Sequence, residues 1–227
     1  MIIIGEKING TRKTVAKAIR DRDADFIKEL AKSQEEAGSS YLDVNAGTAP
    51  VREPEDMRWL VKNIQEASEL PLCLDSANPE ALRIGLETVK QVSLINSLSG
   101  EQSRIDGILP LVREFDVELI ILALDDNGIP ETCEGRLEII HKLIQLAKAE
   151  GLSEKKIYID PLITAISTGT ENAKLAFKTI KAIKEAYPQT HITGGLSNIS
   201  FGMPLRPTIN RFFMAMAIQM GMDSAII

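Results

Sequence analysis

The amino-acid sequence predicts an α/β protein of the (β/α)8 class, a TIM barrel. Three observations lead to this prediction. Short apolar runs alternate with longer segments of helical periodicity along all 227 residues. Eight such runs can be counted, and almost every one ends in a carboxylate or carboxamide residue. Alternation at this spacing builds a parallel sheet from βαβ units, and eight units close into a barrel.

Each expected strand is a short run rich in Ile, Val or Leu that stops at a Gly, a Pro or a polar turn. The first consists of three consecutive isoleucines, and a polar loop over residues 7–11 is expected to follow it. In chain order, the expected strands are residues 2–4, 41–45, 71–75, 93–96, 117–124, 157–161, 191–195 and 224–227.

The expected helices carry apolar residues three and four positions apart. Asp23 can cap the first helix, Pro79 stands at the first position of the third, and Gly151 follows the fifth. In chain order, they are residues 23–37, 54–70, 79–90, 101–115, 132–150, 171–186 and 207–220. An eighth outer helix is absent, so we expect a partner subunit or a missing native C-terminal segment to cover the last strand.

Residues 1–227 are expected to form one domain, because no linker or low-complexity segment divides them. A doubly wound open sheet is the alternative fold, but no Gly-x-Gly-x-x-Gly turn follows the first strand. The net charge of −6 disfavours a nucleic-acid surface, and no run reaches the ~20 apolar residues that cross a bilayer. The well-separated Cys73 and Cys133 fit a reduced, cytoplasmic setting.

Polar residues stand at the carboxyl ends of the expected strands, where barrel enzymes have their active sites. In chain order they are Glu6, Asn9, Asp43, Asn45, Asp75, Asn96, Asp125, Asp126, Asp160 and Asn198. The ring lacks histidine and cysteine and has almost no fixed cation, which disfavours a metal site and a phosphate site. Carboxylates and carboxamides suit a flat, neutral heterocycle with many N–H donors, such as a pterin.

The stretch 193–200, Thr-Gly-Gly-Leu-Ser-Asn-Ile-Ser, follows the seventh expected strand. Two glycines at a strand end let the backbone approach a ligand closely, and the Ser and Asn beyond them can donate to it and accept from it. An ordinary strand-to-helix turn would have a similar composition, and the two histidines, His141 and His191, are expected to be structural.

Seven blocks of the sequence resemble those of the pterin-binding methyltransferases. They are Glu6-Lys7-Ile8-Asn9-Gly10, Leu42-Asp43-Val44-Asn45, Leu72-Cys73-Leu74-Asp75-Ser76, Ile95-Asn96-Ser97, Tyr158-Ile159-Asp160-Pro161-Leu162, Gly195-Leu196-Ser197-Asn198-Ile199-Ser200 and Arg206-Pro207-Thr208-Ile209-Asn210-Arg211. The chain thereby resembles methyltetrahydrofolate:corrinoid protein methyltransferases and the folate domain of cobalamin-dependent methionine synthase. The resemblance covers essentially the whole chain.

This resemblance implies a barrel of the pterin-binding type that transfers methyl groups in one-carbon metabolism. Asp75, Asn96 and Asp160 would bind the pterin ring of tetrahydrofolate. Asn198 would be the catalytic residue beside N5, the atom that carries the methyl group. The remaining expected folate-binding residues are Asn9, Asn45, Gly195, Ser197 and Arg206.

The resemblance also implies a corrinoid, carried by a partner protein or free as cobalamin. Neither histidine stands in the Asp-x-His-x-x-Gly context of corrinoid-binding modules, so this chain is not expected to carry it. Residues 164–170 and 201–206 are the expected partner contacts. The direction of methyl transfer stays open between the acetyl-CoA pathway and demethylation.

Three rival functions remain. A dihydropteroate synthase-like enzyme would share the barrel, but the loop after the first strand lacks the Pro-Asp-Ser-Phe of that family. A non-catalytic pterin-binding protein is the second rival. A metal-dependent barrel hydrolase is disfavoured by the lack of histidine ligands.

Overall fold

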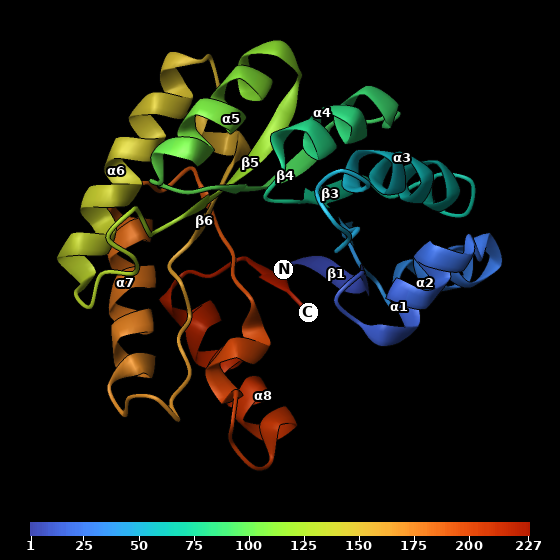
Figure 1. Cartoon of the computed structure of the whole chain (residues 1–227). Helices are drawn as coiled ribbons and strands as arrows, with labels where there is room; N and C mark the ends of the chain where they lie inside the picture. The colour runs from blue at the N-terminus through green and yellow to red at the C-terminus, as the bar shows by residue number, and fades with distance from the viewer.

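The computed structural model describes residues 1–227 and shows eight parallel strands in a single sheet that rolls into a barrel (Figure 1). The strands are β1 (Ile2–Asn9), β2 (Tyr41–Asn45), β3 (Leu72–Asp75), β4 (Ser93–Leu98), β5 (Val117–Leu122), β6 (Ile157–Asp160), β7 (His191–Ile192) and β8 (Ser224–Ile226). β1 pairs with both β2 and β8. A bridge between Gly195 and Ile226, with the Ile226 amide donating to the Gly194 carbonyl at 3.0 Å, joins β7 to β8. The predicted barrel class is confirmed.

Eight α-helices surround the sheet. They are α1 (Lys13–Asp21), α2 (Ala24–Glu36), α3 (Glu53–Ile64), α4 (Pro79–Thr88), α5 (Gln102–Glu114), α6 (Cys133–Ala149), α7 (Asn172–Ala186) and α8 (Arg206–Met220). Both α1 and α2 lie between β1 and β2 in the chain, and within residues 1–227 no helix follows β8. None of the helices is both long enough and apolar enough to cross a membrane. Asp23 caps α2 through the amide of Phe26 as expected, and Gly221 ends α8 in the left-handed conformation.

Two elements differ from the sequence prediction in a way that affects the site. β1 continues through Asn9, so the residues expected to form a loop belong partly to a strand, and α1 follows immediately. β7 has only two residues because the chain leaves the sheet and turns into a short 3-10 helix, η2 (Leu196–Ser200). The Gly-Gly stretch therefore follows the short strand β7, and its backbone still bridges to Ile226 of β8.

The barrel interior is filled with side chains at the amino end and in the middle of the strands. Ile4, Cys73, Leu94, Ile120 and Tyr158 form a buried cluster within the ring of strands. A second cluster of 47 buried residues lies between the strands and the helices. Since the interior is filled with apolar side chains up to this level, polar inward-facing side chains are left for the carboxyl ends of the strands.

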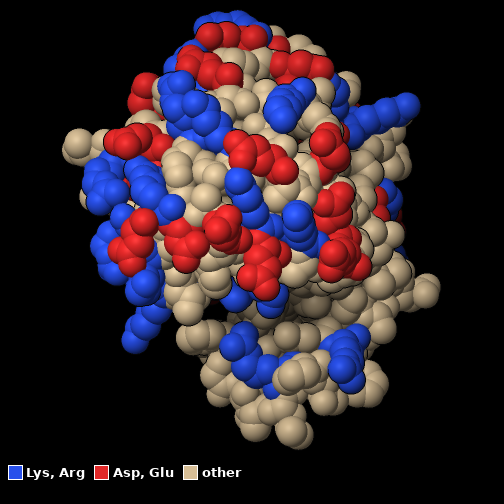
Figure 2. Space-filling model, turned by 90° about the vertical axis from the view of Figure 1, so that its right-hand side faces the viewer, with Lys and Arg blue, Asp and Glu red and all other residues tan.

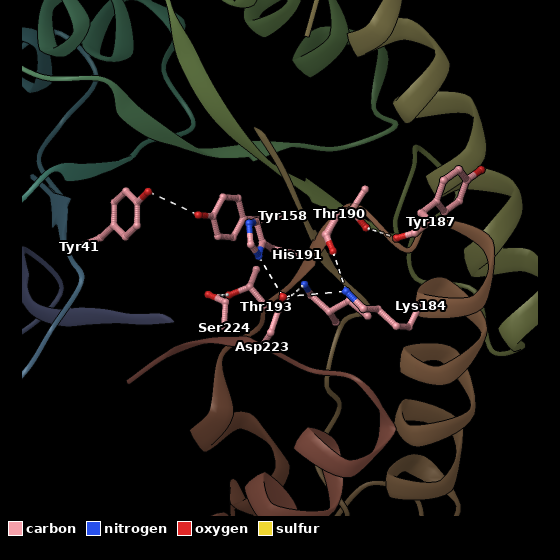
Figure 3. A network of polar contacts seen from close by, with 10 residues as sticks. Tyr41, Tyr158, Lys184, Tyr187, Thr190, His191, Thr193, Asp223 and Ser224 are labelled. Atoms are coloured by element: carbon pink, nitrogen blue, oxygen red, sulfur yellow. Dashed lines mark hydrogen bonds and ion pairs between the residues drawn. The ribbon is translucent and has the colours of Figure 1, made fainter. Parts of the chain in front are cut away.

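The amino end of the barrel is closed by a polar and aromatic network (Figure 3). The Tyr41 hydroxyl donates to Glu118 at 2.5 Å, and the Tyr158 ring stacks on His191 with centroids 4.6 Å apart. His191 Nδ1 in turn lies 3.0 Å from Asp223 Oδ2. His191 is thus a structural residue at the end opposite to the polar ring, as the sequence indicated.

A close backbone contact fixes the ends of β1 and β2. A Cβ built on Gly10 would lie 1.9 Å from the carbonyl oxygen of Ala46. We expect Gly10→Ala to lower the free energy of unfolding by about 1–3 kcal/mol, because the two loops must separate to admit a methyl group. Thermal unfolding followed by circular dichroism measures this change. An unchanged melting temperature would contradict the contact.

A groove of about 340 Å³ runs along the outside of the sheet beside α2. Its lining residues are Ile3, Gly5, Lys7, Ser33, Gln34, Ala37, Ser39 and Ile227. It therefore lies next to the paired strands β1 and β8.

Candidate active site

The polar residues expected at the strand ends come together at the carboxyl end of the barrel. Asn45 ends β2 and Asp75 ends β3, whereas Asn96 lies opposite Asp75 on β4. Asp160 ends β6, further round the ring, opposite Leu122 of β5. Alternation of side chains along a strand explains why these residues share the inner face with the buried layer below them.

Asn45 and Asp75 form a hydrogen-bonded pair. Asn45 Nδ2 donates to Asp75 Oδ2 at 2.8 Å, which leaves Asn45 Oδ1 buried and without a partner in the protein. Burial raises the pKa of Asp75, while the Asn45 bond and the charge of Arg104 act in the opposite direction. A buried acceptor without a partner is costly, so this corner of the site is suited to a ligand that brings N–H donors.

Asp43 belongs to the same cluster, although it was not in the predicted folate-binding set. It is 2% exposed and accepts a hydrogen bond from Asn96 Nδ2 at 3.3 Å. Burial, and after it the charge of Asp75, raise the pKa of Asp43 to about 8. The sequence already indicates Asp43 as a member of the polar ring, and the period of two in β2, which places residue 43 on the same face as residue 45, supports adding it to the binding set.

Asp160 is the most enclosed carboxyl group at the rim after Asp43, at 8% exposed. Its Oδ1 accepts the backbone N–H of Leu162 at 2.7 Å. Burial raises its pKa to about 6, although the Leu162 N–H and the charge of Arg136 oppose the change. Asp160 is therefore mostly ionised at neutral pH and can accept from a donor ligand. A Cβ on Gly194 would lie 3.2 Å from Asp160 Oδ1, so a glycine there leaves room beside the carboxylate.

Asn198 lies in η2 with its side chain exposed and without any hydrogen bond to the protein. A Cβ on Gly195 would approach Asn198 Nδ2 to 2.8 Å, so Gly195 leaves space for the amide. Arg206 donates to the carbonyl of Ser197 at 2.9 Å and to Ser200 Oγ at 3.1 Å. Arg206 therefore fixes the shape of this loop, and Asn198 keeps both its donor and its acceptor available.

Other members of the predicted ring use their oxygens locally. Asn9 Oδ1 accepts from the amide and the hydroxyl of Thr11, at 3.0 and 2.7 Å, which leaves only its NH₂ group available. Asp125 Oδ1 accepts from the Asn127 amide within its own turn, and Asp126 accepts from the Gln102 amide at the start of α5. After β5 the oxygens of the ring are therefore engaged in local turns and at a helix start, whereas Asp75, Asn45, Asp160 and Asn198 lie on the other parts of the ring.

The arrangement suits recognition of a donor-rich ring. Within residues 1–227, no group of three or more His, Cys, Asp or Glu side chains is placed to hold a metal ion. The acceptors come from both sides of the rim: Asp75 and Asn45 on one side and Asp160 on the other. A carboxylate accepts two parallel N–H bonds in a fork, which is the pattern that an amino-pyrimidinone edge presents.

Comparisons with known proteins agree with this chemistry. The sequence profile of the family described as "Pterin binding enzyme" matches residues 5–227. Over 229 residues, which cover 100% of this chain and 84% of the relative, the sequence is 45% identical to a methylcorrinoid:tetrahydrofolate methyltransferase of Eubacterium limosum. It is also 32% identical over 240 residues to methionine synthase of Mycobacterium tuberculosis, covering 100% of this chain and 20% of that protein.

Among solved structures, dihydropteroate synthase from Xanthomonas albilineans in complex with 7,8-dihydropteroate has a similar fold. The TM-score is 0.69 at 16% sequence identity, over 99% of this chain and 86% of that one. Identity this low shows a shared barrel only, whereas the family profile covers nearly every residue. The chain belongs to the family of pterin-binding enzymes.

Proposed function

We propose that this protein transfers a methyl group between N5 of methyltetrahydrofolate and the cobalt of a corrinoid held by a partner protein. The observation that carries the proposal is one rim with two kinds of group. Asp75 and Asp160 are carboxylate acceptors fixed in the ring of strands, and Asn45 Oδ1 beside them is a buried acceptor without a partner. Asn198, in the short helix η2, is an amide without a side-chain hydrogen bond. The names of the E. limosum and M. tuberculosis relatives support this assignment.

In this proposal the fixed acceptors bind the pterin ring. Asp75 and Asp160 accept from the ring N–H and amino groups, and Asn45 Oδ1 gains the donor that it lacks in the protein. Asn96 is held by Asp43, so its amide NH₂ is turned toward Asp43 and its oxygen is presented as an acceptor. Asn9, Gly195, Ser197 and Arg206 complete the folate-binding set, with Gly195 and Arg206 acting through the shape of the loop.

Asn198 is proposed to act on the reacting atom. The corrinoid supplies a cobalt centre that gives up or takes the methyl group. The N5–methyl bond breaks easily only if the nitrogen gains a proton or a stronger hydrogen bond in the transition state. An amide can donate or accept by rotating, so Asn198 can follow N5 through both protonation states.

Titration calorimetry with 5-methyltetrahydrofolate tests the proposal first, and one site per chain is expected. A transfer assay with methylcobalamin or a methylated corrinoid protein and tetrahydrofolate, run in both directions, then tests the reaction. Folate binding without any methyl transfer in either direction would favour a non-catalytic pterin-binding protein. Absence of binding would overturn the proposal altogether.

Folate affinity is expected to depend on pH near 6. Asp160 has its pKa raised to about 6, so lowering the pH through 6 protonates it and removes an ionised acceptor. Folate affinity should therefore fall as the pH falls from 7 to 5. Above pH 7 Asp160 is already ionised, so its titration should not change the affinity further. Binding measured over this range, with the free ligand's own titration subtracted, checks the sign. Affinity that rises toward pH 5 would contradict it.

We also propose a homodimer. The surface of α8 and the loop before it exposes Phe201, Leu205, Phe212 and Met216, at 67%, 76%, 70% and 50%. In Figure 2 the lower part of the molecule shows uncharged atoms and basic side chains but no acidic ones. Apolar residues gathered on one face of a helix are typical of an interface between subunits. Sedimentation velocity should give twice the mass of 24.9 kDa, and a purely monomeric species at micromolar concentration would contradict this.

Residues 1–227 are proposed to work as one domain, in the cytoplasm. Pairing of β1 with β8 supports the first statement, since strands from both ends of this range build one sheet. Cys73 and Cys133 are both free and buried, which supports a reducing compartment. The direction of transfer is left to the assay in both directions.

A further inference from the structure

Arg136 is a buried cation without a carboxylate in contact. It lies in the first turn of α6 and is 2% exposed. Its guanidinium donates only to backbone carbonyls: Nε to Pro130 at 3.0 Å, and Nη1 to Pro161 at 2.7 Å and to Leu162 at 2.9 Å. Burying a charge is costly unless an opposite charge lies near, so this residue requires an explanation.

The turn after β6 supplies that explanation. Leu162 adopts a left-handed backbone conformation with φ of 61°, which a branched residue adopts only when its surroundings impose it. Its N–H donates to Asp160 Oδ1, and its carbonyl accepts from Arg136. One residue therefore links the guanidinium of Arg136 to the carboxylate of Asp160, and Arg136 also holds the carbonyl of Pro161 between them.

We propose that Arg136 is a positioning residue that fixes the orientation of the Asp160 carboxylate toward folate. The inference rests on the proposed function, because Asp160 is a folate acceptor only in that function. Arg136 itself does not touch the ligand. It acts through the turn at residues 160–162 and through its charge.

The surroundings of Asp160 contain no second cation that could replace Arg136. Its neighbour on β5 is Leu122. Gly194, which follows β7, lies near both Asp160 and the apolar end of Ile163. On α6, Cys133 lies near Arg136, and Arg136 is the charged group that acts on Asp160. Loss of this charge should raise the pKa of Asp160 further, so that the carboxyl group is protonated over part of the neutral range.

The experiment combines two variants with two readouts. Arg136→Gln removes both the charge and the guanidinium group with its several N–H donors. Arg136→Lys keeps the charge but not the guanidinium geometry. The carboxyl carbon of Asp160 is titrated by carbon-13 NMR in protein labelled at aspartate, assigned with Asp160→Asn. Affinity for 5-methyltetrahydrofolate is measured on the same samples at pH 7 and pH 9.

For Arg136→Gln we expect the midpoint of the Asp160 titration to move from about pH 6 to about pH 7 or above. Folate affinity should then fall several-fold at pH 7 and recover toward the wild-type value at pH 9, because protonation of the carboxyl group at pH 7 removes the ionised acceptor. Arg136→Lys should keep the midpoint close to that of the wild type. In the Asp160→Asn background, Arg136→Gln should cause no further pH-dependent loss.

Arg104 offers a matched control, because it donates to the backbone carbonyls of Ser76, Ala77 and Ser97 at the ends of β3 and β4. Arg104→Gln should leave the Asp160 midpoint unchanged. An unchanged midpoint in Arg136→Gln, or an affinity loss that is equal at pH 7 and pH 9, would overturn the inference. If Arg136→Gln does not fold, an Arg136→Lys midpoint as high as pH 7 would also overturn it. Wild-type protein that binds no folate would overturn the proposed function, while the NMR titration would still decide whether Arg136 controls Asp160.

Discussion

Asn198→Ala should slow methyl transfer by about 100- to 1,000-fold, equivalent to about 2.7–4 kcal/mol of lost transition-state stabilisation. The affinity for methyltetrahydrofolate should change by less than about threefold, since the pterin ring is held by the acceptors in the barrel. The Asn198 amide is exposed and makes no hydrogen bond to the protein, so its removal leaves no partner unsatisfied and the fold is not expected to weaken.

Rapid mixing of the enzyme with methylated corrinoid and tetrahydrofolate, under single-turnover conditions, isolates the transfer step from binding. Calorimetry on the same variant gives the dissociation constant. Asn127→Ala is a suitable control, because Asn127 is an exposed amide in the turn after β5. If Asn198→Ala lowers affinity and rate by equal factors, Asn198 is a binding residue and not a catalytic one.

Asp160→Asn should weaken folate binding by about 1.5–3 kcal/mol, roughly 10- to 150-fold, when measured at pH 8. At that pH the native carboxylate is ionised, because its pKa of about 6 lies well below. The amide of Asn has the shape of the carboxylate but cannot form the charge-assisted hydrogen bond. Its NH₂ group is a donor that must face another donor, either that of the ligand or the Leu162 N–H. The variant should also lose the fall in affinity near pH 6.

Isothermal titration of Asp160→Asn at pH 5, 6, 7 and 8 measures both effects. Asp125→Asn serves as the comparison, since that carboxylate closes its own turn and is not proposed to touch folate. Wild-type affinity in Asp160→Asn at pH 8 would exclude Asp160 from the pterin edge. A loss in Asp125→Asn of the same size would point to a general effect of charge at the rim.

Much of the fold follows from local pattern. The runs around residues 41–45 and 72–75 are short and bounded by turns, so alternation in the first and a short apolar run in the second are sufficient to place β2 and β3. The helix α1 was missed because only Val15, Ala18 and Ile19 are buried in a segment crowded with charge. That small apolar face is recognisable only against the strand it covers, which depends on tertiary packing.

The sequence predicts which residues lie at the rim of the barrel but not which hydrogen bonds they form. Strand ends indicated Asp75 and Asp160 correctly as members of the rim, because parallel strands present their carboxyl ends together. The partners of each oxygen were not accessible from the sequence. Arg136 lies far along the chain from Leu162, and the bond between Asn96 and Asp43 joins different strands. Only the closed barrel determines which acceptors are already engaged.

Closure of the sheet through β8 has a consequence for biosynthesis. The strand β1 is made first of the eight and β8 last, and the bridge from Ile226 to the Gly194-Gly195 loop forms with β8. Contacts between segments so distant in sequence form slowly, and a nascent chain that has emerged through β7 has two unpaired sheet edges. The Gly194-Gly195 backbone therefore gains its bridge to the sheet only once β8 has been made, and until then the open edges are exposed to pairing with other chains.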